Sequence, residues 1–426
     1  MSALVDAAYL LGITAASPVI GWRLLRTGKH RTDWHARLGR GAPLPAPGPR
    51  GRVLVHAVSV GEVNASRALV EALAVDHEVV VSATTDTGFA RASALFSGIV
   101  PVVRFPYDAS FAMRGFLDRV QPTLVALMEL EVWPNFMELC VRRGIPVGVV
   151  NGRLSARSFS RYRLARPVLR GMFAQLAFVA AQTQAYADRF VAMGTHADRV
   201  QVTGTMKWDT AQVADQVPGA WELAAEMGID PSRPLVVAGS TAPGEERLLH
   251  AAMPAGVQLL CAPRKPEWFD AAAKDLPGCV RRSRGERREG ADRFLLDTIG
   301  ELRKAYALAT LVVVGRSFGT LHGSDMMEPV ALGKATLIGP RYGDFADTAE
   351  RLVAAGGLQV TGSALVGRDV AELLQDPARR AAMAQAGRAV IAREQGATLR
   401  HAALLRAWAM QGAPAHAKIR SDDHCD

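Results

Sequence analysis

Three acidic side chains and one lysine stand where apolar runs end in the first half of the chain. Glu62 opens a predicted helix after one run, and Lys207 follows another. Glu129 and Glu131 end a third run. Residues two apart on a strand share a face, so Glu129 and Glu131 can be neighbouring carboxylates with separated pKa values. A carboxylate within hydrogen-bond reach of a hydroxyl can act as its general base, so this pattern predicts a site for proton transfer.

Both acidic segments also have a purely structural explanation. Glu62 can cap its own helix, as many glutamates in a first helical turn do. In the segment 128–135, one acid can pair with an arginine while the other is solvated. The sequence leaves these alternatives open.

The second half of the chain contains residues suited to a phosphate. Arg264 leaves the end of an apolar run, and the Gly-rich segment 312–340 places Glu328 and Pro329 before a helix. Such segments hold the ribose and phosphate of a nucleotide. Neither half contains GxGxxG or GxxxxGK[ST], so dinucleotide and P-loop sites are not expected. HExxH and DxD are also missing, so the sequence does not demand a metal ion.

The stretch 141–170 is strongly basic, with eight arginines and no acidic residue. Arginine favours bidentate contacts with phosphate. Over the 426 residues, 50 Lys and Arg against 41 Asp and Glu give a net charge of +9, which also favours an anionic partner. Few aromatic residues interleave the stretch and no nucleic-acid motif occurs, so a phosphorylated lipid is favoured over nucleic acid. The alternative is a solvated helix face.

Residues 3–22 are nearly all apolar, interrupted by Asp6 and Pro18, and a basic segment follows them. No lysine or arginine precedes them, so a secretory signal fits poorly. We expect a membrane anchor helix whose basic side faces the anionic cytoplasmic leaflet of the inner membrane. The alternative is a buried amphipathic helix of the first domain.

Apolar runs alternate with helical segments through both halves of the chain, which predicts parallel sheets covered on both faces. Four scattered cysteines favour a reducing compartment over a disulfide scaffold. The expected domains are an anchor and basic linker over 1–50, a first domain over 51–212, a second over 233–410, whose segment from about 375 is helical, and a flexible tail over 411–426.

The fold class is α/β, with two Rossmann-like doubly wound domains. Residues 54–63 and 235–246 have similar sequences, each giving a strand, a serine, a Gly-containing turn, a glutamate and a helix. We expect both turns to present free N–H groups to anionic ligands. Two such domains facing a cleft are typical of nucleotide-sugar glycosyltransferases. The periodicity equally allows an epimerase of this architecture or a periplasmic-type binding protein.

Eight sequence blocks, taken in order, resemble the 3-deoxy-D-manno-octulosonic acid (Kdo) transferases of lipopolysaccharide synthesis. The resemblance runs from about residue 1 to about residue 400. It implies a GT-B type enzyme that moves Kdo from CMP-Kdo to a lipid A precursor with inversion. The blocks are HAVSVGEV, ELEVWPN, NGRLSARS, GTMKWD, AGSTAPGEE, APRKPE, DTIGEL and EPVALGKATLIGP.

The resemblance also implies roles for particular residues. Glu62 matches the catalytic base, and Glu129 and Lys207 match residues that support the transition state. No metal or other cofactor is implied, because the leaving group carries one phosphate. The residues that match CMP-contacting positions are Pro263, Arg264, Ile299, Gly300, Glu301, Asp325, Met326, Met327 and Glu328.

One segment departs from the family pattern. Where the family usually has GGHNPLEP, this chain has HGSDMMEP, so Asp325 replaces an asparagine. A carboxylate beside a phosphate is unfavourable unless a cation such as Arg316 offsets it. The alternatives are therefore a related transferase with a different sugar acid or acceptor and, from another class, a non-catalytic membrane-surface binding protein.

Overall fold

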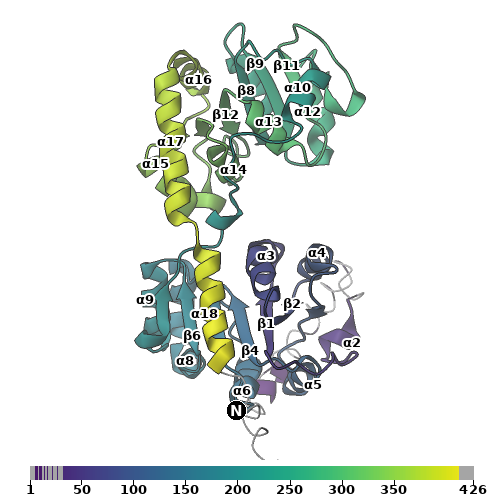
Figure 1. The fold of residues 1–426 in the computed structure, drawn as a ribbon, viewed down its shortest axis with the longest axis vertical. Coiled ribbons are helices and arrows are strands. Elements are labelled where there is room, and N and C mark those ends of the chain that lie inside the picture. The colour runs from purple at the N-terminus through teal and green to yellow at the C-terminus, as the bar shows by residue number, and fades with distance from the viewer. Residues whose placement is uncertain are drawn as a thin grey trace, which may run out of the picture. The chain divides into compact units, whose positions relative to one another are not determined.

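The computed structural model describes residues 5–7, 9–11, 14, 17, 22, 26 and 32–411 (Figure 1). Its contacts divide the chain into two compact units. Unit 1 comprises residues 1–210 and 395–426, and unit 2 comprises residues 211–394. Each unit is built around its own seven-stranded sheet.

The sheet of unit 1 has the strand order β3-β2-β1-β4-β5-β6-β7, and all neighbouring strands are parallel. Parallel strands need crossover connections, and helices supply them here. The strands are β1 (Arg52–Ala57), β2 (Glu78–Ala83), β3 (Val102–Arg104), β4 (Leu124–Met128), β5 (Val147–Gly152), β6 (Phe178–Ala181) and β7 (Val200–Val202).

Helices cover both faces of this sheet. Alternate residues of β1 enter different cores: Leu54 joins Phe116 and Phe136, whereas Val55 joins Leu69. Several of these helices begin at a serine or threonine whose hydroxyl accepts an N–H of the first turn. The helices are α2 (Trp34–Arg37), α3 (Val60–Ala74), α4 (Asp86–Phe96), α5 (Ser110–Val120), α6 (Pro134–Arg142), α7 (Ala156–Leu164), α8 (Arg166–Ala174), α9 (Gln184–Met193) and α18 (Ala397–Gln411), with 3₁₀ turns η2 (Ala197–Arg199) and η3 (Trp208–Thr210).

The sheet of unit 2 has the order β10-β11-β9-β8-β12-β13-β14, again parallel throughout. Its strands are β8 (Leu235–Thr241), β9 (Gln258–Pro263), β10 (Val280–Arg281), β11 (Arg293–Leu295), β12 (Leu311–Val314), β13 (Thr336–Ile338) and β14 (Gln359–Val360). Its helices are α10 (Ala220–Met227), α11 (Glu245–Ala252), α12 (Phe269–Asp275), α13 (Leu302–Leu308), α14 (Met327–Ala331), α15 (Ala346–Ala354), α16 (Val366–Gln375) and α17 (Pro377–Glu394), with 3₁₀ turns η4 (Pro266–Trp268), η5 (Arg282–Arg284) and η6 (Gly343–Phe345).

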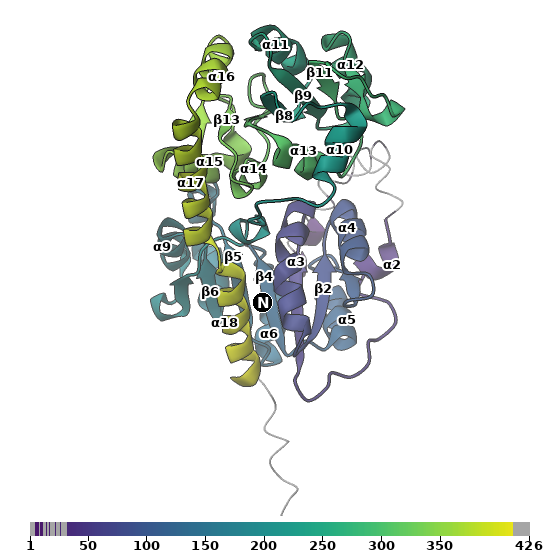
Figure 2. The ribbon, with the colours of Figure 1, turned by 45° about the horizontal axis from the view of Figure 1, so that its top comes forward.

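The two parallel sheets confirm the predicted α/β class, but the C-terminal segment differs from the expectation. The sequence predicted a helical segment from about 375 to 410 within the second domain. Instead the helix is interrupted at Gly396, which has a φ of 90°. The following helix, α18, belongs to unit 1 (Figures 1 and 2). Ala402 and Leu405 are buried there in the same core as α3, because these small and apolar side chains line one face of α18.

Most of the predicted anchor at 3–22 lies outside the described residues, as do residues 412–426 of the predicted tail. Asp6, which is described, accepts hydrogen bonds from the Ser110 N–H (3.0 Å) and the Asn135 amide (2.9 Å). The Tyr9 hydroxyl donates to Asp108 at 3.1 Å. None of the helices in the described part of the chain combines the length and apolar character needed to cross a bilayer.

Candidate functional site

Glu62 lies in the first turn of α3, at the carboxyl end of β1. Its carboxylate accepts the Val58 N–H at 2.8 Å and the Ser59 hydroxyl at 2.7 Å. Ser59 is the N-cap of α3, so the two side chains form a reciprocal capping arrangement. The structural reading of Glu62 is therefore correct, yet the side chain is only half-buried. A carboxylate held in one orientation and open to solvent is also suited to proton transfer.

Glu129 follows the last residue of β4 and has a left-handed backbone, with a φ of 58°. Its N–H donates to the Val150 carbonyl, and its own carbonyl accepts the Arg153 N–H. The conformation costs roughly 1–2 kcal/mol outside glycine, and such strain often occurs at functional sites. The bend ends the strand, so the prediction that Glu129 and Glu131 share a strand face is wrong.

Glu129 nevertheless raises the pKa of Glu131, and Glu62 raises the pKa of both acids. Burial raises the pKa of Glu129, and repulsion from Glu62 adds to this, while Arg153 and Lys207 oppose it. Burial, and then the charge of Glu62, raise the pKa of Glu131 to about 7, although its hydrogen bond from the Trp133 indole acts in the other direction. The charges of Glu62 and Glu129 therefore add to the effect of burial on Glu131, and Glu131 is partly protonated near neutral pH.

Arg153 and Lys207 supply the positive charge of this cluster. Their loops are joined because the Met206 N–H donates to the Asn151 side-chain oxygen at 3.1 Å. In the sequence, Arg153 is distinguished only as one of the arginines of the basic stretch 141–170. Its position directly after the strand 147–152 is the signal that could have singled it out.

The cluster thus combines acids from the loops after β1 and β4 with cations from the loops after β5 and β7. In a parallel sheet, the carboxyl ends of neighbouring strands share one edge, so these side chains converge there. Within the described residues, His, Cys, Asp and Glu form no group of three arranged to hold a metal ion. The arrangement can accept a proton from a hydroxyl and stabilise a developing negative charge.

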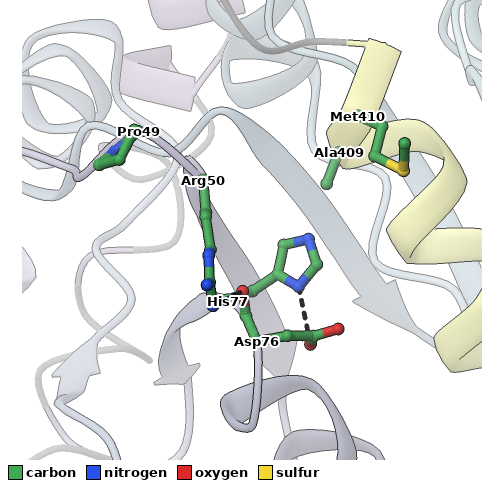
Figure 3. Close-up of a pocket in the computed structure, with 6 residues that line it drawn as sticks. All are labelled: Pro49, Arg50, Asp76, His77, Ala409 and Met410. Carbon is green, nitrogen blue, oxygen red and sulfur yellow. Dashed lines mark hydrogen bonds and ion pairs between the residues drawn. The ribbon is translucent and has the colours of Figure 1, made fainter.

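A cavity of about 440 Å³ lies at the opposite edge of the same sheet (Figure 3). Arg50 precedes β1, and Asp76 and His77 precede β2, so the cavity is at the amino ends of the strands. Figure 3 shows His77 bonded to Asp76, at 2.9 Å. Asp76 also accepts from Arg406 of α18 at 2.8 Å. These groups fasten α18 and are separate from the carboxylate cluster.

In unit 2, Pro263 and Arg264 stand at the carboxyl end of β9. Pro263 is buried as the last residue of the strand, and Arg264 is exposed. The Arg264 N–H donates to the Thr241 carbonyl at 3.0 Å, which ties this turn to the end of β8. The guanidinium therefore extends from a fixed backbone at the carboxyl ends of the strands, where ligands of α/β folds commonly bind.

The predicted triplet 299–301 divides into an open part and an anchored part. Ile299 is 72% exposed, and Gly300 has a φ of 95° that favours glycine. Glu301 accepts two hydrogen bonds from Arg282, both at 3.1 Å, and one from Thr298 at 2.6 Å. The Arg282 bond is the main cause that lowers the pKa of Glu301, so this side chain mainly orders its loop.

The unusual segment 325–328 precedes the short helix α14. Asp325 is exposed, and its carboxylate accepts the Met327 N–H at 2.8 Å. Met326 and Met327 are buried, so they extend the core. Glu328 lies 3.5 Å from Arg303, and burial raises the pKa of Glu328. Pairing of Asp325 with Arg316 stays a prediction.

We expected free N–H groups in the two similar turns. This expectation is wrong for one N–H group in each turn, because each donates to a carboxylate. In unit 1, the Val58 N–H is bonded to Glu62. In unit 2, the Ala242 N–H is bonded to Glu245. Each turn thus binds a carboxylate of its own helix rather than leaving these donors to a ligand.

The fold indicates the class of protein to which this chain is similar. A solved structure described as a putative UDP-N-acetylglucosamine 2-epimerase from Listeria monocytogenes is similar to this chain with a TM-score of 0.55. The similarity covers 84% of this chain and 97% of that structure at 16% identity. Two parallel-sheet α/β domains of this kind are the architecture of GT-B glycosyltransferases and related epimerases.

The family follows from sequence comparison. A family model for 3-deoxy-D-manno-octulosonic-acid transferase (kdotransferase) matches residues 32–210. The 3-deoxy-D-manno-octulosonic acid transferase of Bordetella pertussis is 35% identical over 94% of this chain and 98% of that protein. That of Haemophilus influenzae is 31% identical over 91% and 94%. The chain belongs to the Kdo transferase family and is a glycosyltransferase.

Proposed function

We propose that this enzyme transfers Kdo from CMP-Kdo to a lipid A precursor, with inversion at the anomeric carbon, in lipopolysaccharide synthesis. The observation that carries the proposal is the cluster of Glu62, Glu129 and Glu131 with Arg153 and Lys207 in unit 1. It supplies a base and compensating cations at the edge of the sheet where ligands of α/β folds bind. Membership of the Kdo transferase family supports Kdo as the sugar that is transferred.

In the proposed reaction, Glu62 takes the proton of the acceptor hydroxyl as its oxygen attacks the anomeric carbon. The new C–O bond forms on the face opposite the departing phosphate, which leaves with the bonding electron pair as CMP. Ser59 and the Val58 N–H orient the Glu62 carboxylate. Lys207 lowers the pKa of Glu129 and favours its ionised form, and both support the transition state.

The donor side of the proposal rests on unit 2. Arg264 binds the CMP phosphate, and the segments 299–301 and 325–328 contact the rest of the nucleotide. One departing phosphate needs no bridging metal, because a guanidinium can take the developing charge. We therefore propose a reaction without a metal or other cofactor.

The acceptor is a phosphorylated lipid, so we propose that unit 1 works at the cytoplasmic face of the inner membrane. Helices α7 and α8 support this, because their arginines are exposed and accompany Leu164 and Val168, which are 85% and 81% exposed. A basic surface with projecting apolar side chains suits an anionic bilayer. The exposed arginines of these helices are Arg157, Arg161, Arg163, Arg166 and Arg170.

Transfer of radiolabelled Kdo tests the proposal. The full chain is incubated with CMP-Kdo, generated enzymatically, and with a lipid A precursor of defined acylation. We expect labelled lipid whose anomeric configuration, read by NMR, is opposite to that of the donor. Retention would overturn the mechanism, and transfer only from another activated sugar acid would overturn the donor.

Vesicle sedimentation tests the membrane part. We compare the full chain, a chain lacking residues 2–22, and a chain with Arg157, Arg161 and Arg166 changed to Gln. Binding through α7 and α8 is released by high salt, because ordinary salt screens charges over about 8–10 Å. Undiminished binding of the Gln variant to anionic vesicles would contradict the proposed surface.

A further inference from the structure

Asn151 joins the two loops that carry the cations of the candidate site. Its side-chain oxygen accepts the Met206 N–H, one residue before Lys207. Its carbonyl accepts the Gln182 side-chain amide at 2.9 Å. Asn151 is fully buried and has a left-handed backbone, with a φ of 52°. Asparagine adopts this conformation more readily than most residues, and here both its side chain and its carbonyl are bonded.

His401 of α18 supplies the contact that holds this backbone. Its Nε2 accepts the Asn151 N–H at 2.8 Å, and its Nδ1 lies 2.6 Å from the Ala397 carbonyl. A carbonyl can only accept, so Nδ1 carries the proton and Nε2 is free to accept. Burial lowers the pKa of His401, which favours this neutral form.

The start of α18 is fastened to the Lys207 loop by a second set of contacts. The carboxylate of Asp209 accepts the N–H groups of Gly396 (2.6 Å) and Thr398 (2.5 Å). The Gln395 amide donates to the Trp208 carbonyl at 3.1 Å. The segment 206–210 is therefore bonded on one side to Asn151 and on the other to α18.

We propose that His401 is a positioning residue for glycosyl transfer: through its Nε2 acceptor it fixes Asn151, and thereby the loops of Arg153 and Lys207. This inference rests on the proposed function of those two loops. The contact spans 250 positions in the sequence, from the end of β5 to the last described helix. Without it, a buried N–H would lose its partner, and the left-handed turn would be free to relax.

Two substitutions of His401 by residues of similar size distinguish loss of the hydrogen-bond acceptor from a change in packing. In His401→Gln, the side-chain oxygen reaches the position of Nε2 and can accept the Asn151 N–H. In His401→Asn, the side chain reaches only the position of Nδ1. Thr398→Val is the matched control on the same helix, because the Thr398 hydroxyl is buried and makes no hydrogen bond within the described chain.

The experiment measures kcat and KM for Kdo transfer by the full-length variants, together with the melting temperature and the Kd for CMP. We expect kcat to fall about 10- to 100-fold in His401→Asn, since a misplacement of about 1 Å can cost that much. His401→Gln should stay within about threefold of wild type, as should Thr398→Val. CMP affinity should be unchanged throughout, because the proposed donor contacts lie in unit 2.

Three outcomes would overturn the inference: unchanged kcat in folded His401→Asn, equal losses in the Gln and Asn variants, or an equal loss in Thr398→Val. Kdo transfer by Lys207→Ala shows whether the positioning role of His401 alone is wrong or the proposed function itself is wrong. If Lys207→Ala abolishes transfer while His401→Asn does not change it, only the positioning role is wrong. If wild type transfers no Kdo, or Lys207→Ala transfers it normally, the proposed function itself fails.

Discussion

The turn after β1 and the turn after β8 have similar sequences, and each places a glutamate in the first turn of a helix. The structure uses the two glutamates differently. Glu62 accepts one N–H and one hydroxyl from its own turn and stays half-buried. Glu245 is buried and accepts four N–H groups: those of Ala242 in its own turn and of 316–318 after β12.

The comparison shows that two glutamates at similar positions differ in their bonding partners, although their residue type is the same. Glu245 has both oxygens committed to the backbone of two segments, so it ties β8 to β12. Glu62 has local partners only, and it raises the pKa of Glu129 and of Glu131. A fully bonded carboxylate is a poor base, whereas a partly bonded one beside other acids can accept a proton.

The largest expected effect is on turnover in Glu62→Gln. Gln keeps the shape and an acceptor oxygen for the cap but cannot take a proton, so kcat should fall by roughly 100-fold or more. The melting temperature should change little. Near-normal turnover would remove Glu62 from the mechanism and would leave it only a helix-capping role.

The matching change in unit 2, Glu245→Gln, should affect stability. Gln has one acceptor oxygen and no charge, so some of the four N–H groups lose their partner. We expect the free energy of unfolding to fall by about 2–3 kcal/mol, the scale for bonds to a charged group. Urea denaturation measures this. A larger loss in Glu62→Gln than in Glu245→Gln would reverse the comparison.

In the turn after β8, the Ala242 N–H is already bonded to Glu245. Arg264→Ala tests whether unit 2 nevertheless binds the donor. Donor binding should weaken by about 1.5–3 kcal/mol, because a charged hydrogen bond to phosphate is lost. Calorimetry with CMP measures this, and acceptor binding should be unchanged. Equal losses for donor and acceptor would instead assign Arg264 a packing role.

The raised pKa of Glu131 should appear in the pH dependence of stability. Glu131 has a folded pKa of about 7 against an ordinary value of 4.5, so the folded state binds more protons between these pH values. Its contribution to stability is therefore present below about pH 4.5 and is lost as the pH rises to about 7. Glu131→Gln should gain roughly 1–2 kcal/mol relative to wild type between pH 5 and pH 8, by denaturation. A constant difference would mean that folding does not raise the pKa of Glu131.

The smallest effect is expected for Asp325→Asn, which restores the family's residue. Asn can still accept the Met327 N–H, so the turn before α14 should persist. Removing a negative charge near the donor phosphate should tighten CMP binding by up to about tenfold, or 1.4 kcal/mol. Weaker binding would indicate that Asp325 bonds the ribose. If neither Asp325→Asn nor Arg316→Ala alters CMP affinity, this segment does not hold the donor.

The amino-acid sequence by itself determined the features of this protein that depend on local pattern. Apolar runs separated by helices predicted two parallel sheets, because strands buried on both faces need continuous apolar residues. Ordered motif blocks predicted the family, and the capping role of Glu62 was predicted correctly, whereas its role as a base stays a prediction. These inferences need only residue type, order and spacing.

Only the tertiary structure decided which of the candidate groups act on one another. The raised pKa values of Glu129 and Glu131 depend on burial and on the charge of Glu62 from a separate segment of the chain. The return of α18 to unit 1 and the bond from Asn151 to His401 join positions 250 residues apart. No local pattern encodes such contacts, because their energy arises from packing and desolvation in the assembled core.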